Sequence, residues 1–184
     1  MSYVKDELVP GYVAKFVIHQ HFATNEHFDL RIEFPVDSLK NDLCRYTENR
    51  SKKSEEPQEV YLDRPGIVLR SWVIPKHKIP STTAPLLATE TENHNLDYEK
   101  FEGIIPKGNY GAGRVKIFDK GTCKLISVIY DKKYVFDFKG KKLKGLFALI
   151  KIKGKKFLWL KIKNTNKYNK VSKYEIIIRE IVNE

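Results

Sequence analysis

The strongest constraint on the fold is an alternation of apolar and polar side chains with a period of two. In residues 27–34, HFDLRIEF, every second side chain is apolar and those between are polar or charged. The run 157–163, FLWLKIK, alternates in the same way. This is the pattern of a half-buried β-strand, because successive side chains of a strand point to opposite sides of the sheet.

Other β-prone runs extend this pattern over much of the chain. Five residues separate the runs 13–21 and 27–34, which predicts a hairpin, and the run 67–76 predicts a strand that Pro75 closes. Beyond residue 113, further runs are punctuated by Gly121, Gly140 and Gly154. The sequence therefore predicts a mainly β protein in which an antiparallel sheet curls into a β-barrel.

The length of 184 residues fits one domain spanning 1–184, which can bury a core without disulfides. Residues 37–65 interrupt the strand pattern, because they are polar and charged and lack any period. We expect them to form an inserted loop. The last segment, KYEIIIREIVNE, fits either a terminal helix or an edge strand.

The chain is strongly basic, with a formal net charge of +11, and the stretch 139–173 contains 13 lysines and no acid. A solvated face explains such a run most simply, whereas the functional explanation is a surface for nucleic acid. The sequence has two cysteines, no secretory signal and no apolar run near the roughly 20 residues that cross a bilayer. We expect a cytoplasmic protein without membrane contact.

The polar face of the HFDLRIEF strand carries residue types that bind metals and phosphate. Its His27 and Asp29 lie about 7 Å apart at roughly 3.3 Å per residue, so both can converge on one ion. His21 ends the preceding strand and can reach His27, with His19 two residues back on the same face. Two imidazoles and a carboxylate suit Mn²⁺, Zn²⁺ or Fe²⁺ better than Ca²⁺. Arg31 adds a planar cation that matches phosphate oxygens.

A second group of candidate residues lies between residues 94 and 113. His94 and Tyr98 stand four residues apart, although a lone histidine is more often an ordinary core or surface residue. They precede three glycines, namely Gly108, Gly111 and Gly113. The G-x-x-G-x-G spacing and the strand predicted after it do not fit a dinucleotide-binding loop. Tight turns, or a close approach of the backbone to a ligand, explain these glycines better.

Together these motifs resemble the 3′-phosphoesterase domain that is fused in bacterial ligase D proteins and also occurs as free-standing enzymes. The matching stretches occur in the family's order and cover roughly residues 14–164, apart from the insert. They are FVIHQHFATNEHFDLRIEF, SWVIPK, HNLDYEKFEGIIPKGNYGAGRVKIFDKGT and KLKGLFALIKIKGKKFLWLKIKN. The resemblance implies a free-standing member with a compact β-barrel and short flanking helices.

The resemblance also implies an activity and its residues. A member of this family uses Mn²⁺, or another divalent transition metal, to remove a 3′-phosphate or a 3′-terminal ribonucleoside from DNA or mixed DNA/RNA primer ends. Its implied role is in non-homologous end joining, with primer-template ends, a separate ligase and a polymerase as partners. The metal ligands carried over are His21, His27 and Asp29. The residues carried over for the scissile phosphate are Arg31, His94 and Tyr98.

Two departures from the family and two rival functions remain at this point. The family usually has another residue type where His19 stands, so His19 is either a spare ligand or a neighbour. Few residues precede the first strand, so the ribonuclease activity has less support than the phosphatase activity. An Fe²⁺/2-oxoglutarate oxygenase would use His27, Asp29 and His94 as a facial triad, leaving His21 and Arg31 without roles. A non-catalytic module would bind nucleic acid through its lysines alone.

Overall fold

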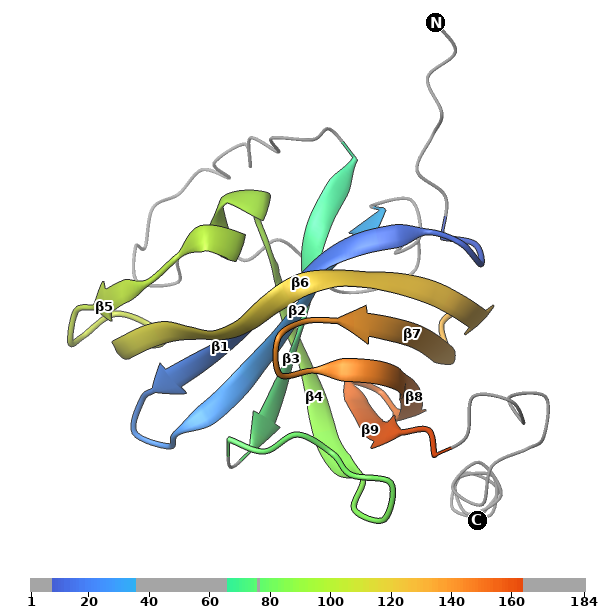
Figure 1. Ribbon diagram of the computed structural model, residues 1–184. Coiled ribbons are helices and arrows are strands. Elements are labelled where there is room, and N and C mark those ends of the chain that lie inside the picture. Colours follow the sequence, from blue (N-terminus) through green and yellow to red (C-terminus); the bar gives the residue numbers. More distant parts are fainter. Residues whose placement is uncertain (1–7, 36–65, 76, 164–184) are drawn as a thin grey trace, which may run out of the picture.

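The computed structural model describes residues 8–35, 66–75 and 77–163, which form nine strands and one short 3-10 helix (Figure 1). The predicted insert at 37–65 and the segment KYEIIIREIVNE lie outside these residues. The elements are β1 (Val13–Phe22), β2 (His27–Pro35), β3 (Ile67–Pro75), β4 (Leu86–His94), η2 (Leu96–Lys100), β5 (Gly103–Ile105), β6 (Gly113–Ile129), β7 (Lys133–Lys139), β8 (Lys144–Lys153) and β9 (Lys156–Lys161).

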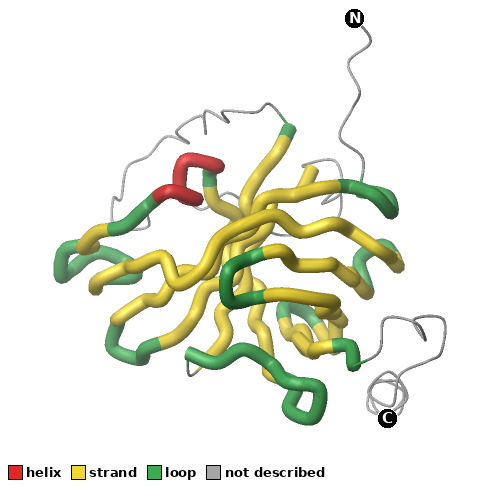
Figure 2. Tube along the Cα trace, in the orientation of Figure 1, coloured by secondary structure: helices red, strands yellow, loops and turns green. Residues whose placement is uncertain are grey.

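Eight of the strands close into an antiparallel barrel, which confirms the predicted fold class (Figure 2). They run in the order β1-β2-β3-β4-β9-β8-β7-β6, and β6 pairs with β1 to close the ring. The short β5 pairs with the beginning of β6 outside this ring. The short flanking helices that were expected are absent from the described residues, in which the only helical element is the single 3-10 turn η2, because strands and their short turns account for almost all of this part of the chain. Within these residues no helix is long and apolar enough to span a bilayer.

The predicted punctuation by glycine holds at Gly140 and Gly154 and fails at Gly121. Gly140 lies in the turn between β7 and β8. Gly154 has a φ of 55° and lies in the turn between β8 and β9, as expected. Gly121 instead lies inside β6, which continues through it for 17 residues. A Cβ at Gly121 would collide with the carbonyl of Lys139 on β7, so the glycine permits close approach of two strands and does not end one.

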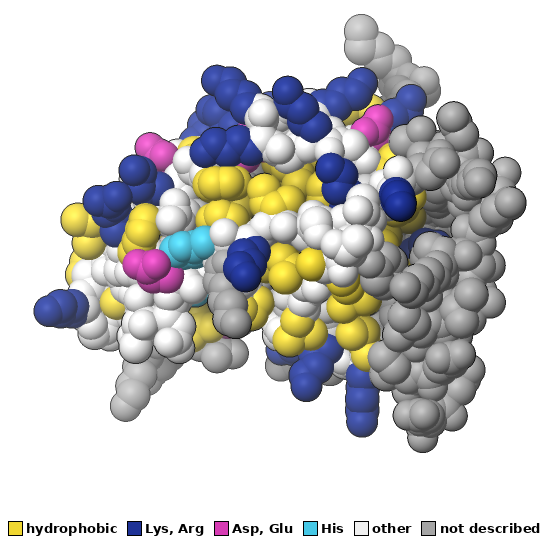
Figure 3. Space-filling model, turned by 60° about the horizontal axis from the view of Figure 1, so that its bottom comes forward, with side chains coloured by type: hydrophobic (Ala, Val, Ile, Leu, Met, Phe, Trp, Pro, Cys, Tyr) yellow, Lys and Arg dark blue, Asp and Glu magenta, His cyan; other side chains and the backbone are white. Residues whose placement is uncertain are grey.

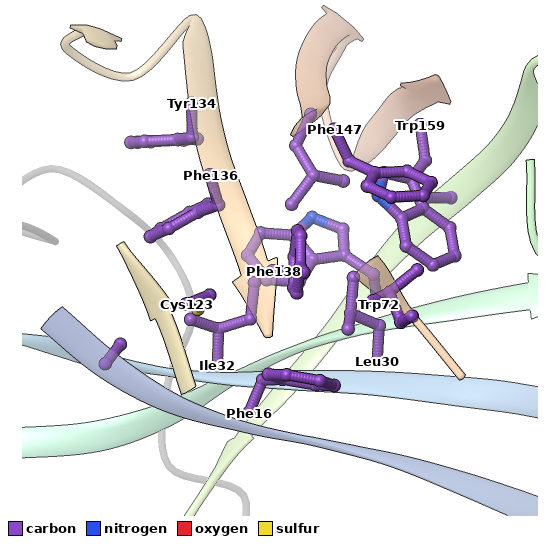
Figure 4. Close-up of a cluster of buried hydrophobic side chains, with 14 of the residues drawn as sticks. Phe16, Leu30, Ile32, Trp72, Cys123, Tyr134, Phe136, Phe138, Phe147 and Trp159 are labelled. Atoms are coloured by element: carbon purple, nitrogen blue, oxygen red, sulfur yellow. The ribbon is translucent and has the colours of Figure 1, made fainter. Parts of the chain in front are cut away.

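The barrel interior is filled mainly by aromatic rings, several of which meet edge to face (Figure 4). The apolar face of β2 points into this core, as its alternation predicts. In β9, however, Trp159 fills the core while Leu158 and Leu160 belong to a second apolar cluster on the other face. The prediction of a half-buried strand is therefore wrong for β9, because both of its faces carry buried side chains. It is wrong for β2 as well, because the polar face of β2 is buried along with the apolar one.

Candidate metal centre and phosphate site

The outer face of the β1–β2 hairpin brings His21, His27 and Asp29 together. In the hairpin register His21 faces His27, and His19 faces Asp29. The ligand atoms of His21, His27 and Asp29 all lie within 4.8 Å of one another. Asp29 Oδ2 lies 3.7 Å from His21 Nδ1 and 3.5 Å from His27 Nε2. The face on which they meet is not a solvated strand surface, because Asp29 is only 4% exposed.

Backbone carbonyls orient both imidazoles so that each turns one nitrogen toward Asp29. His21 Nε2 lies 2.7 Å from the carbonyl oxygen of Gly111, and His27 Nδ1 lies 2.8 Å from that of Asn25. Since a carbonyl only accepts, each of these nitrogens carries the hydrogen and donates it. The opposite nitrogens, in the neutral rings, present lone pairs beside the carboxylate, which is the arrangement that a metal-binding histidine needs. The donor set of two nitrogens and one oxygen fits a divalent transition metal.

The charge of Asp29 is stabilised by its surroundings. Burial by itself would raise the pKa of this carboxyl, but the guanidinium of Arg31 and the imidazoles of His21 and His27 together hold it well below its usual range. The carboxylate in turn raises the pKa of His27, because it can accept a hydrogen bond from the protonated form of the ring and attracts its charge. The site therefore contains a carboxylate at neutral pH.

Arg31 lies beside this cluster and is held by three further side chains. Its Nη2 is 3.3 Å from Asp29 Oδ2, and its Nη1 donates to Ser71 Oγ at 2.9 Å. Its Nε donates to His19 Nδ1 at 3.0 Å. The other nitrogen of His19 donates to the carbonyl of Phe101. Burial and the nearby Arg31 lower the pKa of His19 to about 4, so the ring stays neutral and can accept this hydrogen bond.

His94 and Tyr98 complete the group on the far side of Arg31. His94 Nδ1 lies 2.8 Å from the carbonyl oxygen of Glu92 and 3.1 Å from Arg31 Nη1. Burial and Arg31 lower the pKa of His94 to about 3. The ring centroids of Tyr98 and His94 lie 4.7 Å apart. The guanidinium of Arg31 lies 4.8 Å from the centroid of the Tyr98 ring. Burial raises the pKa of Tyr98, which keeps its hydroxyl protonated.

All six residues expected from the sequence thus lie in one continuous site. Sequence reasoning missed Ser71 and the role of the Gly111 carbonyl. Gly111 has a φ of 73° and lies within the Gly-rich loop, so the glycine spacing was the available signal. The structure also places His19 against Arg31 and outside the group of three ligand atoms, as a neighbour of the site.

The lysine-rich strand β8 does not border this site. Around the barrel, β8 is reached from β2 through β3, β4 and β9 in one direction, and through β1, β6 and β7 in the other. The lysines on β8 therefore lie across the barrel from the histidine cluster, whereas β9 pairs with β4, the strand that carries His94. A charge run in a sequence gives no information on which side of a closed sheet it will occupy.

Residues 59–151, about half of the chain, match the model of the DNA ligase D 3′-phosphoesterase domain. The chain belongs to this family. The matched stretch includes His94 and Tyr98, whereas the hairpin that carries the histidine cluster precedes it.

The family's relatives are longer proteins. The chain is 32% identical over 152 residues to the multifunctional non-homologous end joining DNA repair protein LigD of Mycobacterium tuberculosis, and this covers 81% of the chain but 16% of that protein. LigD of Mycolicibacterium smegmatis is 31% identical over 161 residues, covering 82% of the chain and 17% of that protein. LigD of Pseudomonas aeruginosa is 34% identical over 127 residues, covering 66% of the chain and 15% of that protein.

Proposed function

We propose that this 3′-phosphoesterase family member is a metal-dependent hydrolase that removes 3′-phosphate from DNA or mixed primer ends during DNA end joining. The observation that carries the proposal is the buried cluster of His21, His27 and Asp29 beside Arg31. The names of the relatives support a role in non-homologous end joining. We further propose Mn²⁺ as the metal, removal of a 3′-terminal ribonucleoside as a second activity, and a ligase and a polymerase as partners.

The cluster residues would hold the metal, which supplies positive charge to a phosphate oxygen and activates water. Arg31 binds the phosphate as a planar cation and lowers the energy of the charge that builds up during transfer. A phosphate dianion beside His94 raises the proton affinity of its ring, which can then donate a hydrogen bond. The protonated hydroxyl of Tyr98 is a further donor.

The position of His94 favours this proposal over an oxygenase. A facial triad would need His94 beside His27 and Asp29. In the structure the third residue of the cluster is His21, while His94 contacts Arg31 and Glu92. A cation and a phenol next to the cluster fit a phosphate ester, whereas 2-oxoglutarate chemistry assigns no role to His21.

The experiment is to incubate the protein with a 3′-phosphate primer-template, with and without Mn²⁺, and to measure free phosphate. We expect metal-dependent release, and we expect His27→Ala to abolish both the release and metal binding measured by calorimetry. Thr122→Ala, at an exposed position of β6 that faces Lys15 at the end of β1 away from the cluster, is the matched control and should behave as the wild type. Full turnover by purified His27→Ala protein would refute the assignment.

A further inference from the structure

Four aromatic rings form a continuous row on the opposite face of the β1–β2 hairpin. The ring of His77 stacks on Phe28 at 5.2 Å between centroids and contacts Phe22 at 5.8 Å. Phe28 in turn lies 4.5 Å from Phe118. Phe28 is buried, whereas the other three rings are partly exposed. We call these four residues the aromatic row.

A cation covers each end of the aromatic row. The guanidinium of Arg114 lies 5.0 Å from the centroid of Phe22, and Lys142 Nζ lies 4.1 Å from that of Phe118. Both cationic residues are exposed. Figure 3, which brings the lower side of Figure 1 forward, shows apolar side chains on this side of the molecule with Lys and Arg side chains around them. One carboxylate, that of Glu26, lies 3.6 Å from His77 and is 58% exposed.

The aromatic row begins where the histidine cluster ends. Phe22 directly follows His21, and Phe28 directly follows His27, so the two surfaces occupy opposite faces of the same two strand ends. Only the turn of residues 23–26 separates them. A strand whose 3′ end lies at the cluster can therefore continue over the tip of the hairpin onto the aromatic row.

We propose that the aromatic row binds the nucleotides that precede the 3′ end of the nucleic acid where these nucleotides are unpaired, as in a 3′ overhang. Every base has a π-face that can stack on an aromatic ring, and such stacking is independent of sequence. Arg114 and Lys142 supply positive charge for the phosphates between the bases. The statement that the bound strand has its 3′ end at the histidine cluster rests on the proposed function. The statement that nucleic acid binds the aromatic row is argued from the rings and cations alone.

The test measures binding separately from turnover. The ligand is a fluorescent single-stranded DNA of about 12 nucleotides with a 3′-hydroxyl, and its affinity is measured by anisotropy in EDTA. We expect Phe22→Ala and Arg114→Glu each to weaken binding about tenfold, because each removes a stacking ring or a phosphate contact. The matched control is Lys124→Glu, the same charge change at an exposed site on β6 that faces Val13 at the other end of the strand.

A second ligand separates stacking from charge. Replacing the bases near the 3′ end by abasic sites should weaken binding to the wild type but should have little further effect on Phe22→Ala. Circular dichroism melting confirms that each variant is folded. Wild-type affinity in both row variants, or an equal loss in Lys124→Glu, would overturn the proposal.

These outcomes are distinct from those of the phosphatase assay. If the wild type releases no phosphate but the row variants bind DNA more weakly, the role of the aromatic row is supported and the proposed hydrolase activity is refuted. If phosphate is released but the row variants bind DNA as the wild type does, the role of the aromatic row is refuted and the hydrolase activity is supported.

Discussion

Two buried arginines on neighbouring strands, Arg70 and Arg31, differ in how completely their partners hold them. Arg70 points into the barrel, where its Nε and Nη2 donate to both oxygens of Glu90 at 2.8 and 2.9 Å. Its Nη1 donates to the hydroxyl of Tyr134, and four aromatic rings lie around it. Arg31 points outward, and its contact with the carboxylate of Asp29 is monodentate, with Nη2 3.3 Å from Oδ2.

The two ion pairs differ in geometry and in burial within the barrel. The bidentate contact with Glu90 satisfies the planar fork of Arg70, and it raises the pKa of Arg70 although burial opposes the charge. The guanidinium of Arg31, by contrast, contacts neutral acceptors such as His19. The carboxylate that it contacts, that of Asp29, also lies beside His21 and His27. The structure thus gives Arg70 a closed partner inside the core, while Arg31 lies at the outer face of the barrel, where the proposed function has it bind a phosphate.

The largest expected effect is a loss of stability on breaking the bidentate pair of Arg70 and Glu90. Arg70→Met removes the cationic partner of Glu90 inside the aromatic core, and breaking a buried pair in this way costs about 3–5 kcal/mol. We expect this loss in the free energy of unfolding, measured by urea denaturation at neutral pH. The double variant with Glu90→Leu should recover much of it. Unchanged stability of Arg70→Met would show that the pair is not a structural element.

Breaking the monodentate pair of Arg31 and Asp29 should affect activity more than stability. Arg31→Met is expected to lower kcat for phosphate release about 10²–10³-fold, as for the loss of one donor to a developing oxyanion. Its free energy of unfolding should fall by less than that of Arg70→Met, because His27, whose pKa Asp29 raises, can take up a proton and replace part of the lost positive charge. Steady-state kinetics and urea denaturation of the same preparation test both parts. A large stability loss with retained kcat would reverse the comparison.

The smallest effect is expected at His19, which acts through Arg31. His19→Ala removes the acceptor that holds Arg31 Nε, and loss of such an orienting partner typically costs about 10–100-fold in activity. We expect the loss in kcat more than in KM. His19→Asn keeps a side-chain acceptor near the position of Nδ1 and should restore part of the rate. Equal kinetics for the alanine and asparagine variants would remove the orienting role.

Much of the hairpin that carries the cluster could be predicted from the sequence. The two-residue period gives the strands and the side of each residue, so His27, Asp29 and Arg31 had to share one face of β2. The five-residue connection predicts the hairpin that returns His21 to the same end. These features are local, because they depend on strand geometry and on residues close in the chain.

The rest depended on the order of strands around the barrel. His94 lies 63 residues after Arg31, and only the β2-β3-β4 pairing brings the two side chains together. Strand order also placed the lysines of β8 opposite the cluster and let β6 continue through Gly121. A period of two encodes which face of a strand a side chain occupies. This period does not encode which strand lies next to that one or which residues cover that face. Both depend on how the strands pair in the closed barrel.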